Sequence, residues 1–358
     1  MRATRRSGRA AAPPEPAPAS RIQSSLAHVV DRRVDALDDD LPASLKGDVG
    51  AVHKARVATR RLREAVPLTF GRGKGHRLLK RLKKLTRSLG PLRELDVALA
   101  SLADRVGRRR DAGLAALRHH LEGERKTALA RLREAMDRPR AARLVKRLRK
   151  QVRRAQDPET REALAGRARK ILLARAVDQA RRLHEAVAAS GAMFIVERVH
   201  GVRIEAKRLR YALELVGELR LAPTAPLVAR LKAVQEILGE LHDLDVLRAH
   251  ATVVHATAGA DVPSAALVAL ARALDEEARH LHARYLRRVR ALVLLTDRVR
   301  DRMATCLDPS VSTSSATPSP KSAARTGPTT ASGRSATTAS SDGGARRRAS
   351  SRSTPGQT

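Results

Sequence analysis

Two segments of the chain share an unusual spacing of histidine and basic residues. The segment AVHKARVATRRLREA, at residues 51–65, matches RVHGVRIEAKRLRYA, at residues 198–212. In each copy a His is followed by basic residues three, seven, eight and ten positions later. Guanidinium and ammonium groups donate hydrogen bonds to phosphate oxygens, and Arg does so through a planar fork. The chemistry that this pattern indicates is the binding of a phosphate-rich anion.

Helical geometry gives each copy one basic side and one apolar side. His53, Arg56 and Arg60 fall on one side of a helix, and Ala58 and Leu62 fall on the opposite side. The second copy divides in the same way, with His200, Arg203, Lys207 and Arg210 opposite Val202, Leu209, Ala212 and Leu213. We therefore expect the apolar sides to pack and the basic sides to bind.

A second pair of matching segments follows at nearly the same offset. LLKRLKKLTRSLGPLRELDV, at residues 78–97, matches LVARLKAVQEILGELHDLDV, at residues 227–246. The first copy has a basic stripe, formed by Lys80, Lys83, Lys84 and Arg87, of which only the equivalent of Lys83, Lys232, remains basic in the second copy. Two matches at nearly one offset predict a duplicated helical unit, with the stronger anion binder in its first copy.

The elements that must position these residues are predicted to be helices throughout. Ala, Leu, Arg and Glu dominate residues 21–308, and runs of β-branched or aromatic residues are missing. We expect an all-α protein with two similar antiparallel bundles, at residues 21–138 and 159–308, joined by residues 139–158. Residues 1–20 and 309–358 are poor in apolar residues and are predicted to be a disordered arm and a disordered tail.

The net charge of the chain lies mostly on the predicted folded part. Of the formal +35, the arm carries +3 and the tail +6, which leaves +26 on residues 21–308. No stretch reaches the roughly 18 apolar residues of a membrane-spanning helix, so no membrane partner is expected. Cys306 is the only cysteine, and the N-terminus lacks the apolar centre of a secretory signal. A cytoplasmic protein is the expectation.

Acidic residues raise two alternatives that the spacing does not favour. Glu94, Asp96, Asp243 and Asp245 follow a helix-breaking Gly, and we interpret them as first-turn acids that complement the helix dipole rather than as metal ligands. Glu122, Glu124 and Lys126 spell E-x-E-x-K, which resembles the signature of triphosphate tunnel metalloenzymes. That signature needs a strand, whereas a helix is expected here.

Neither a Gly-rich phosphate loop nor a paired nucleophile and base is present in the sequence. We therefore expect no catalytic activity, no cofactor and no metal.

The repeated V-H-x-x-R-[VI]-x-x-[RK]-R-L-R segment, followed by L-x-x-L-G-x-L-x-[DE]-L-D-V, resembles the CHAD family, the conserved histidine α-helical domains. The resemblance covers nearly all of residues 21–308. It implies two pseudo-symmetric four-helix bundles whose basic faces converge on a channel or groove that binds inorganic polyphosphate, and it implies localisation to polyphosphate granules. The expected binding residues are His53, Arg56, Arg60, Arg61, Arg63, Lys80, Lys83, Lys84, Arg87, His200, Arg203, Lys207, Arg208, Arg210 and Lys232.

A nonspecific DNA-binding or nucleoid-associated protein is the alternative. The arm and the tail, which contains Arg346, Arg347 and Arg348, could grip nucleic-acid phosphates, and so could the charge on the core. The chain has no Trp, two Phe and two Tyr, which leaves little for base stacking. Because duplex binding needs no stacking, the alternative stays open.

Overall fold

The computed structural model describes residues 18–70, 72–106, 111–257 and 265–307. All of these residues lie within one compact unit, residues 1–313. The expected tail at 309–358 and residues 1–17 of the expected arm lie outside the described residues. Residues 18–20, which we assigned to the arm, are helical instead.

Helices account for nearly all of the described residues, and no strand occurs among them. The helices are α1 (Pro18–Ser44), α2 (Val49–Thr69), α3 (Arg72–Val106), α4 (Ala112–Ala135), α5 (Arg138–Gln156), α6 (Pro158–Ser190), α7 (Val196–Glu218), α8 (Ala225–Thr257) and α9 (Ala265–Leu307). The prediction of an all-α fold is confirmed for the described part of the chain.

Short polar residues and prolines set several of the helix boundaries. The carboxylates of Asp48, Asp111 and Asp137 each accept a hydrogen bond from a backbone N–H in the first turn of α2, α4 and α5. These caps satisfy donors that have no partner within the helix. Pro139 and Pro158 stand in the first turns of α5 and α6, where the missing N–H costs nothing.

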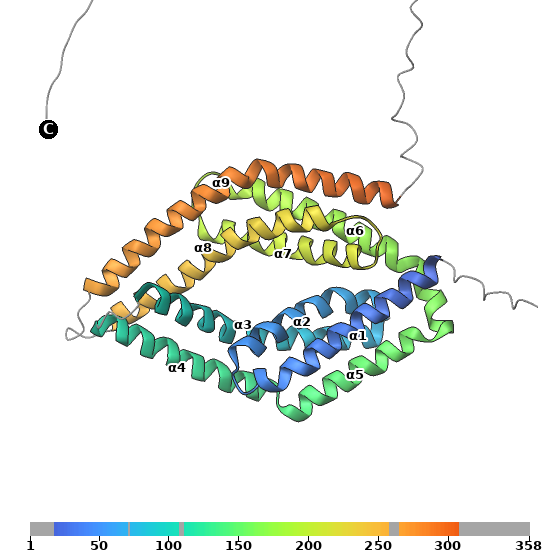
Figure 1. Ribbon diagram of the computed structural model, residues 1–358, viewed down its shortest axis with the longest axis horizontal. Coiled ribbons are helices and arrows are strands. Elements are labelled where there is room, and N and C mark those ends of the chain that lie inside the picture. Colours follow the sequence, from blue (N-terminus) through green and yellow to red (C-terminus); the bar gives the residue numbers. More distant parts are fainter. Residues whose placement is uncertain (1–17, 71, 107–110, 258–264, 308–358) are drawn as a thin grey trace, which may run out of the picture. The chain divides into compact units, whose positions relative to one another are not determined.

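The helices pack as two groups (Figure 1). In the first group α1 packs on α2 and α5, and α3 packs on α2 and α4. In the second group α6 packs on α7 and α9, and α8 packs on α7 and α9. The groups meet where α1 contacts α6, where α3 and α4 contact α8, and where α2 contacts α7. Residues 139–158, which we expected to join the bundles, form most of α5 and pack against α1.

Leucine side chains fill the interior of both groups. Leu62 of α2, Leu82 of α3 and Leu209 of α7 have no exposed surface. They lie on the apolar sides that the helical spacing predicted. The basic side of α2 and α7 therefore has to face away from the packed interior of its own group.

Two predicted helix breaks are wrong. Gly90-Pro91 lies within α3, and Gly239 lies within α8, so both helices continue through these positions. The acids that follow these glycines, Glu94 and Asp243 among them, are consequently in the middle of helices and not in a first turn. Their role has to be sought in the side chains that surround them.

Replacing Leu62 by Ala should lower the free energy of unfolding by about 2–5 kcal/mol, because a fully buried side chain is lost and a cavity remains. Urea titration followed by circular dichroism measures this loss. Leu294 of α9, which is 48% exposed, is the matched control. A loss for Leu62→Ala no larger than for Leu294→Ala would contradict the packing of α2.

Candidate anion-binding site

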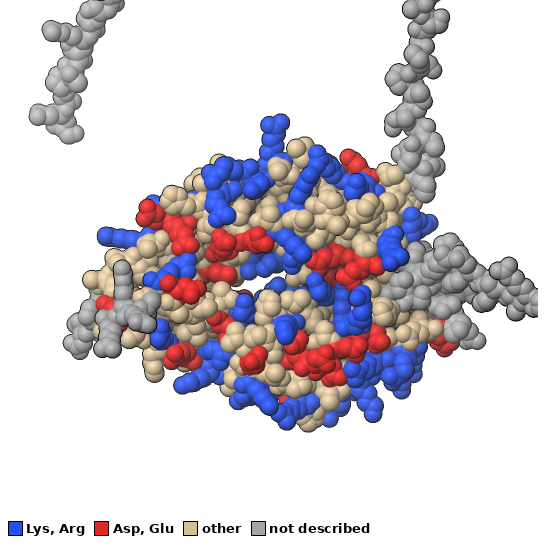
Figure 2. Space-filling model, in the orientation of Figure 1, with Lys and Arg blue, Asp and Glu red and all other residues tan. Residues whose placement is uncertain are grey.

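Four cations from the two helix groups lie close together where α2 faces α7. They are Arg56 and Arg60 of α2 and Arg203 and Lys207 of α7, and we call them the central cluster. Arg60 and Arg203 each lower the pKa of Arg56, and Arg60, Arg56 and Arg203 all lower the pKa of Lys207. Figure 2 shows an opening in the middle of the molecule, between α7 and α8 above and α2 and α3 below, bordered by basic and acidic side chains.

Partial burial makes this concentration of positive charge costly. Loss of water around the side chain is the main cause that lowers the pKa of Lys207 to about 7, and the neighbouring Arg203, Arg60 and Arg56 lower it further. Burial, followed by the charge of Arg60, lowers the pKa of Arg56 to about 10. Burial and the neighbouring positive charges both disfavour the charged forms here. A bound anion would supply the missing interaction.

Two acids from neighbouring helices offset part of the charge. Glu94 of α3 lies 3.7 Å from the Arg56 guanidinium, and the charge of Asp243 of α8 raises the pKa of Arg203 against the effect of burial. Burial raises the pKa of Asp243 itself. The interpretation of these acids as dipole-complementing first-turn residues is thus wrong, because they lie mid-helix beside the cluster. Two acids against four cations leave an excess of positive charge.

The other two acids of the repeated segment have structural partners. Asp96 is buried and accepts a hydrogen bond of 2.7 Å from Nε of Arg125. Asp245 accepts one of 2.9 Å from Arg248, on the same helix. Among the described residues, no group of three His, Cys, Asp or Glu side chains is placed to hold a metal ion.

The two repeated histidines stand at the edges of the cluster in similar surroundings. Burial lowers the pKa of His53, and Arg93, Arg60 and Arg56 lower it further. Burial, Arg203 and Lys207 lower the pKa of His200. Both rings are therefore mainly neutral at pH 7, and each would gain a proton more readily once an anion offsets the arginines.

Sequence reasoning left Arg93 and His242 out of the binding residues. The His242 ring of α8 lies 5.1 Å from the His200 ring, and burial together with Arg203 lowers its pKa to about 4. The charge of Arg93 of α3 adds to burial in lowering the pKa of His53. A signal was present, because Arg93 and His242 occupy equivalent positions in the second pair of matching segments.

Gly90 leaves room on α3 for the Arg56 side chain. A Cβ atom added at Gly90 would lie 2.8 Å from a terminal nitrogen of Arg56. The same guanidinium donates a hydrogen bond of 3.5 Å to the carbonyl of Thr86, one turn earlier in α3. The glycine therefore provides space for the Arg56 side chain and does not end the helix.

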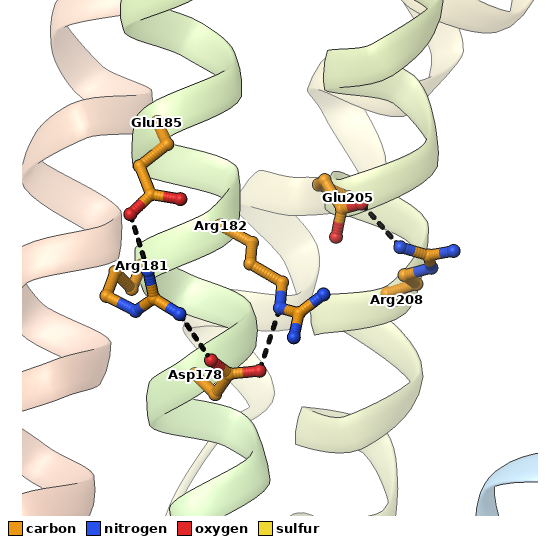
Figure 3. A network of polar contacts seen from close by, with 6 residues as sticks. All are labelled: Asp178, Arg181, Arg182, Glu185, Glu205 and Arg208. Carbon is orange, nitrogen blue, oxygen red and sulfur yellow. Dashed lines mark hydrogen bonds and ion pairs between the residues drawn. The ribbon is translucent and has the colours of Figure 1, made fainter.

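A second set of cations continues from the central cluster along the same faces. Burial lowers the pKa of Arg63, and the charges of Arg60, Arg208 and Arg87 lower it further. Arg63 of α2 thus lies near both Arg60 and Arg87, and the positive region extends from Arg60 towards α3. Arg208 of α7 pairs with Glu205 at 2.5 Å (Figure 3), which leaves it partly neutralised.

Arg61 and Arg210 both form ion pairs with Glu214, and the pair with Arg61 links the two helix groups. Glu214 of α7 lies 3.6 Å from the Arg61 guanidinium and 3.7 Å from Nε of Arg210. Arg33 of α1 donates hydrogen bonds to the carbonyl of Arg61 and to Glu218. These contacts join α1, α2 and α7, so Arg61 contributes to holding α2 against α7, whereas the pair of Arg210 with Glu214 lies within α7.

The stripe on α3 divides between two surroundings. Lys80, Lys84 and Arg87 line a cleft between α3 and the region where α4 passes into α5. Lys83 and, on α8, Lys232 are exposed. The structure thus brings together the arginines and histidines of α2 and α7, while the α3 lysines face an adjoining surface.

Other basic residues of the described surface are neutralised locally. Asp178 of α6 accepts hydrogen bonds from Arg181 and Arg182, and Glu185 accepts one from Arg181 (Figure 3). These bonds raise the pKa of Arg181, the opposite of what is found for Arg56. The Glu122, Glu124 and Lys126 string lies on helix α4, as expected, and so lacks the strand that the metalloenzyme signature needs.

Lys207 should make the ligand-free protein more stable at alkaline pH. Its folded pKa of about 7 is below the unfolded value of about 10.4, so between these pH values the unfolded chain binds more protons and stability rises with pH. Urea unfolding at pH 6.5, 8 and 9.5 should therefore show the wild type gaining on a Lys207→Met variant as pH rises.

Lys232→Met, which alters an exposed lysine of α8, is the control and should leave the pH profile unchanged. A difference between wild type and Lys207→Met that stays constant with pH would refute the depressed pKa.

No helix among the described residues is long and apolar enough to cross a membrane.

Comparison with known proteins places the chain in a family. The CHAD domain matches residues 28–252. The crystal structure of the CHAD domain from the plant Ricinus communis is similar with a TM-score of 0.50 and 23% identity, over 79% of this chain and 91% of that one. PptA from Streptomyces chartreusis has a TM-score of 0.49 and 19% identity, over 78% of this chain and 99% of that one. The search of curated proteins found no match. Because the family match spans more than half of its length and includes both histidine helices, the chain belongs to the CHAD domain family.

Proposed function

We propose that this protein binds linear inorganic polyphosphate, without catalysis, at the central cluster formed by Arg56, Arg60, Arg203 and Lys207. The observation that carries the proposal is the juxtaposition of four partly buried cations from α2 and α7, with Glu94 and Asp243 as acidic neighbours. Binding at this place fits a role on polyphosphate granules in the cytoplasm.

The physical case rests on relief of repulsion. Burial and the neighbouring cations lower the pKa values of Arg56, Arg203 and Lys207, and a phosphate chain that enters the opening would replace repulsion by charge-assisted hydrogen bonds. Polyphosphate presents a negative charge on each unit and no base to read, so a row of cations is all that recognition requires. Arg63 and Arg87 extend that row beyond the cluster.

The proposal includes an internal duplication that forms the site. Arg56 corresponds to Arg203 and Arg60 to Lys207 in the matching segments, and the equivalent helices α2 and α7 contact one another. Two pseudo-symmetric bundles would then present the same basic side to one ligand. The packing of the helices supports this. In the second group α9 contacts α8 and α6, and in the first group α4 contacts α3 while α5 contacts α1. The long helix α9 thus corresponds in its contacts to α4 and α5 together.

Removing the cluster charges should weaken binding. The variant Arg56→Gln/Arg60→Gln/Arg203→Gln/Lys207→Gln should lose at least tenfold in affinity for long-chain polyphosphate at fixed salt. Its salt dependence should also flatten, because each lost phosphate contact removes about 0.7 from the slope of log K against log salt, if single strands are a guide. Fluorescence anisotropy with labelled polyphosphate measures both quantities.

The control removes four exposed cations of α9, by changing Arg279, Arg287, Arg290 and Arg298 to Gln, so that net charge falls equally. Competition with duplex DNA, matched in charge equivalents, tests the alternative. If the cluster variant bound like the α9 control, or if DNA displaced polyphosphate at equal charge, the proposal would fail.

A further inference from the structure

Among the described helices, α5 has the highest density of positive charge, and none of its residues belongs to the central cluster. Nine of its 19 residues are Lys or Arg, and none is Asp or Glu. Its apolar side, which includes Leu144 and Leu148, is buried. Figure 2 shows Lys and Arg side chains gathered over the position of α5, at the lower right edge of that view, next to a band of acidic side chains.

Five of these cations form a line along one flank of the helix. Arg140, Arg143, Arg147, Lys150 and Arg154 recur at alternating spacings of three and four residues, which places them on one side of a helix over about 21 Å. All five are exposed. We call this line the α5 stripe.

Acidic neighbours neutralise a different part of α5. Arg149, on another flank, pairs with Asp35 and Asp38 of α1 at 3.0 Å each. Within the stripe, Arg140 pairs at 3.5 Å with Asp137, the cap of the same helix. Among the side chains that the structure describes, Arg143, Arg147 and Lys150 have no acidic partner within ion-pair distance. The positive charge of the stripe is therefore largely uncompensated.

A cleft lies between the first residue of the stripe and the basic residues of α3. It has a volume of about 350 Å³, and its charged lining consists of Lys80, Arg81, Lys84 and Arg87 of α3 together with Arg140, the first residue of the stripe. The charge of Arg87 also lowers the pKa of Arg63, which lies beside the central cluster. Cations thus follow one another from Arg60 through Arg63 and Arg87 to Arg140.

We propose that the α5 stripe is a second segment of the polyphosphate-binding surface, which holds the part of a long chain that extends beyond the central cluster. This inference rests on the proposed function and adds a chain-length selectivity to it. Like charges three and four residues apart oppose helix formation, and a polyanion laid along the stripe removes that opposition.

The geometry favours a narrow, linear phosphate chain as the occupant. The stripe is a single line of side chains on one helix, with the acids of α1 beyond the other flank of α5. The cleft at its end is lined by the α3 cations Lys80, Arg81, Lys84 and Arg87 and by Arg140 of the stripe. A flexible chain with one charge per unit can lie along such a line of cations around the helix group.

The test compares two lengths of the same ligand. Tripolyphosphate is short enough to occupy the central cluster alone, whereas long-chain polyphosphate reaches the stripe. The variant Arg143→Gln/Arg147→Gln/Lys150→Gln of the full chain should bind tripolyphosphate like the wild type. Its affinity for long-chain polyphosphate should fall on the order of tenfold, and the salt slope for long chains should fall by about 2. Calorimetry over several salt concentrations measures both.

The control variant Arg279→Gln/Arg287→Gln/Arg290→Gln removes the same charge from exposed positions of α9 and should bind both ligands like the wild type. Unchanged long-chain affinity of the stripe variant, equal losses for both lengths, or the same loss in the α9 control would overturn the inference. The proposed function has a separate readout, because it requires that the central-cluster variant lose affinity for tripolyphosphate, which the stripe variant keeps.

Discussion

Repulsion between like charges is the constraint on which the arrangement of this protein depends. Arg56 and Arg60 on α2 face Arg203 and Lys207 on α7, and their mutual effect, added to burial, lowers the pKa of Lys207 to about 7. Such an arrangement persists only if other contacts hold the helices in place. The buried leucines of each group and the ion pair of Glu214 with Arg61, which links α7 to α2, supply them. The fold thus holds the four cations together against their repulsion, and under the proposed function a bound anion would lower the energy of this arrangement.

The periodicity of the sequence predicted the helical class and the basic and apolar sides of the helices, because local geometry decides which side of a helix is basic. The all-α class and the opposite placement of Arg56 and Leu62 are both found in the structure. The breaks at Gly90 and Gly239 were predicted wrongly, since glycine and proline have a strong local signal that tertiary packing overrode. At Gly90 the reason is visible, because the Arg56 guanidinium occupies the space that a side chain would fill.

Which cations meet could not be predicted in the same way. The spacing made Arg61 and Arg210 equal candidates with Arg56 and Arg203, yet Glu214 engages the first two, and this acid belongs to no matching segment that we used. The α5 stripe was overlooked for a related reason, since Pro139 and Pro158 marked its segment as a connection. Both prolines instead begin helices, where they are well tolerated.

The most direct test of the central claim is the thermal stability of the whole protein with increasing long-chain polyphosphate, beside orthophosphate at equal phosphate concentration. A connected chain that relieves repulsion should stabilise the wild type, by about 2.7 kcal/mol at a hundredfold excess over Kd. Orthophosphate should do far less, and the variant lacking the charges of Arg56, Arg60, Arg203 and Lys207 should not respond. Equal stabilisation of wild type and variant, or none of the wild type, would contradict the account.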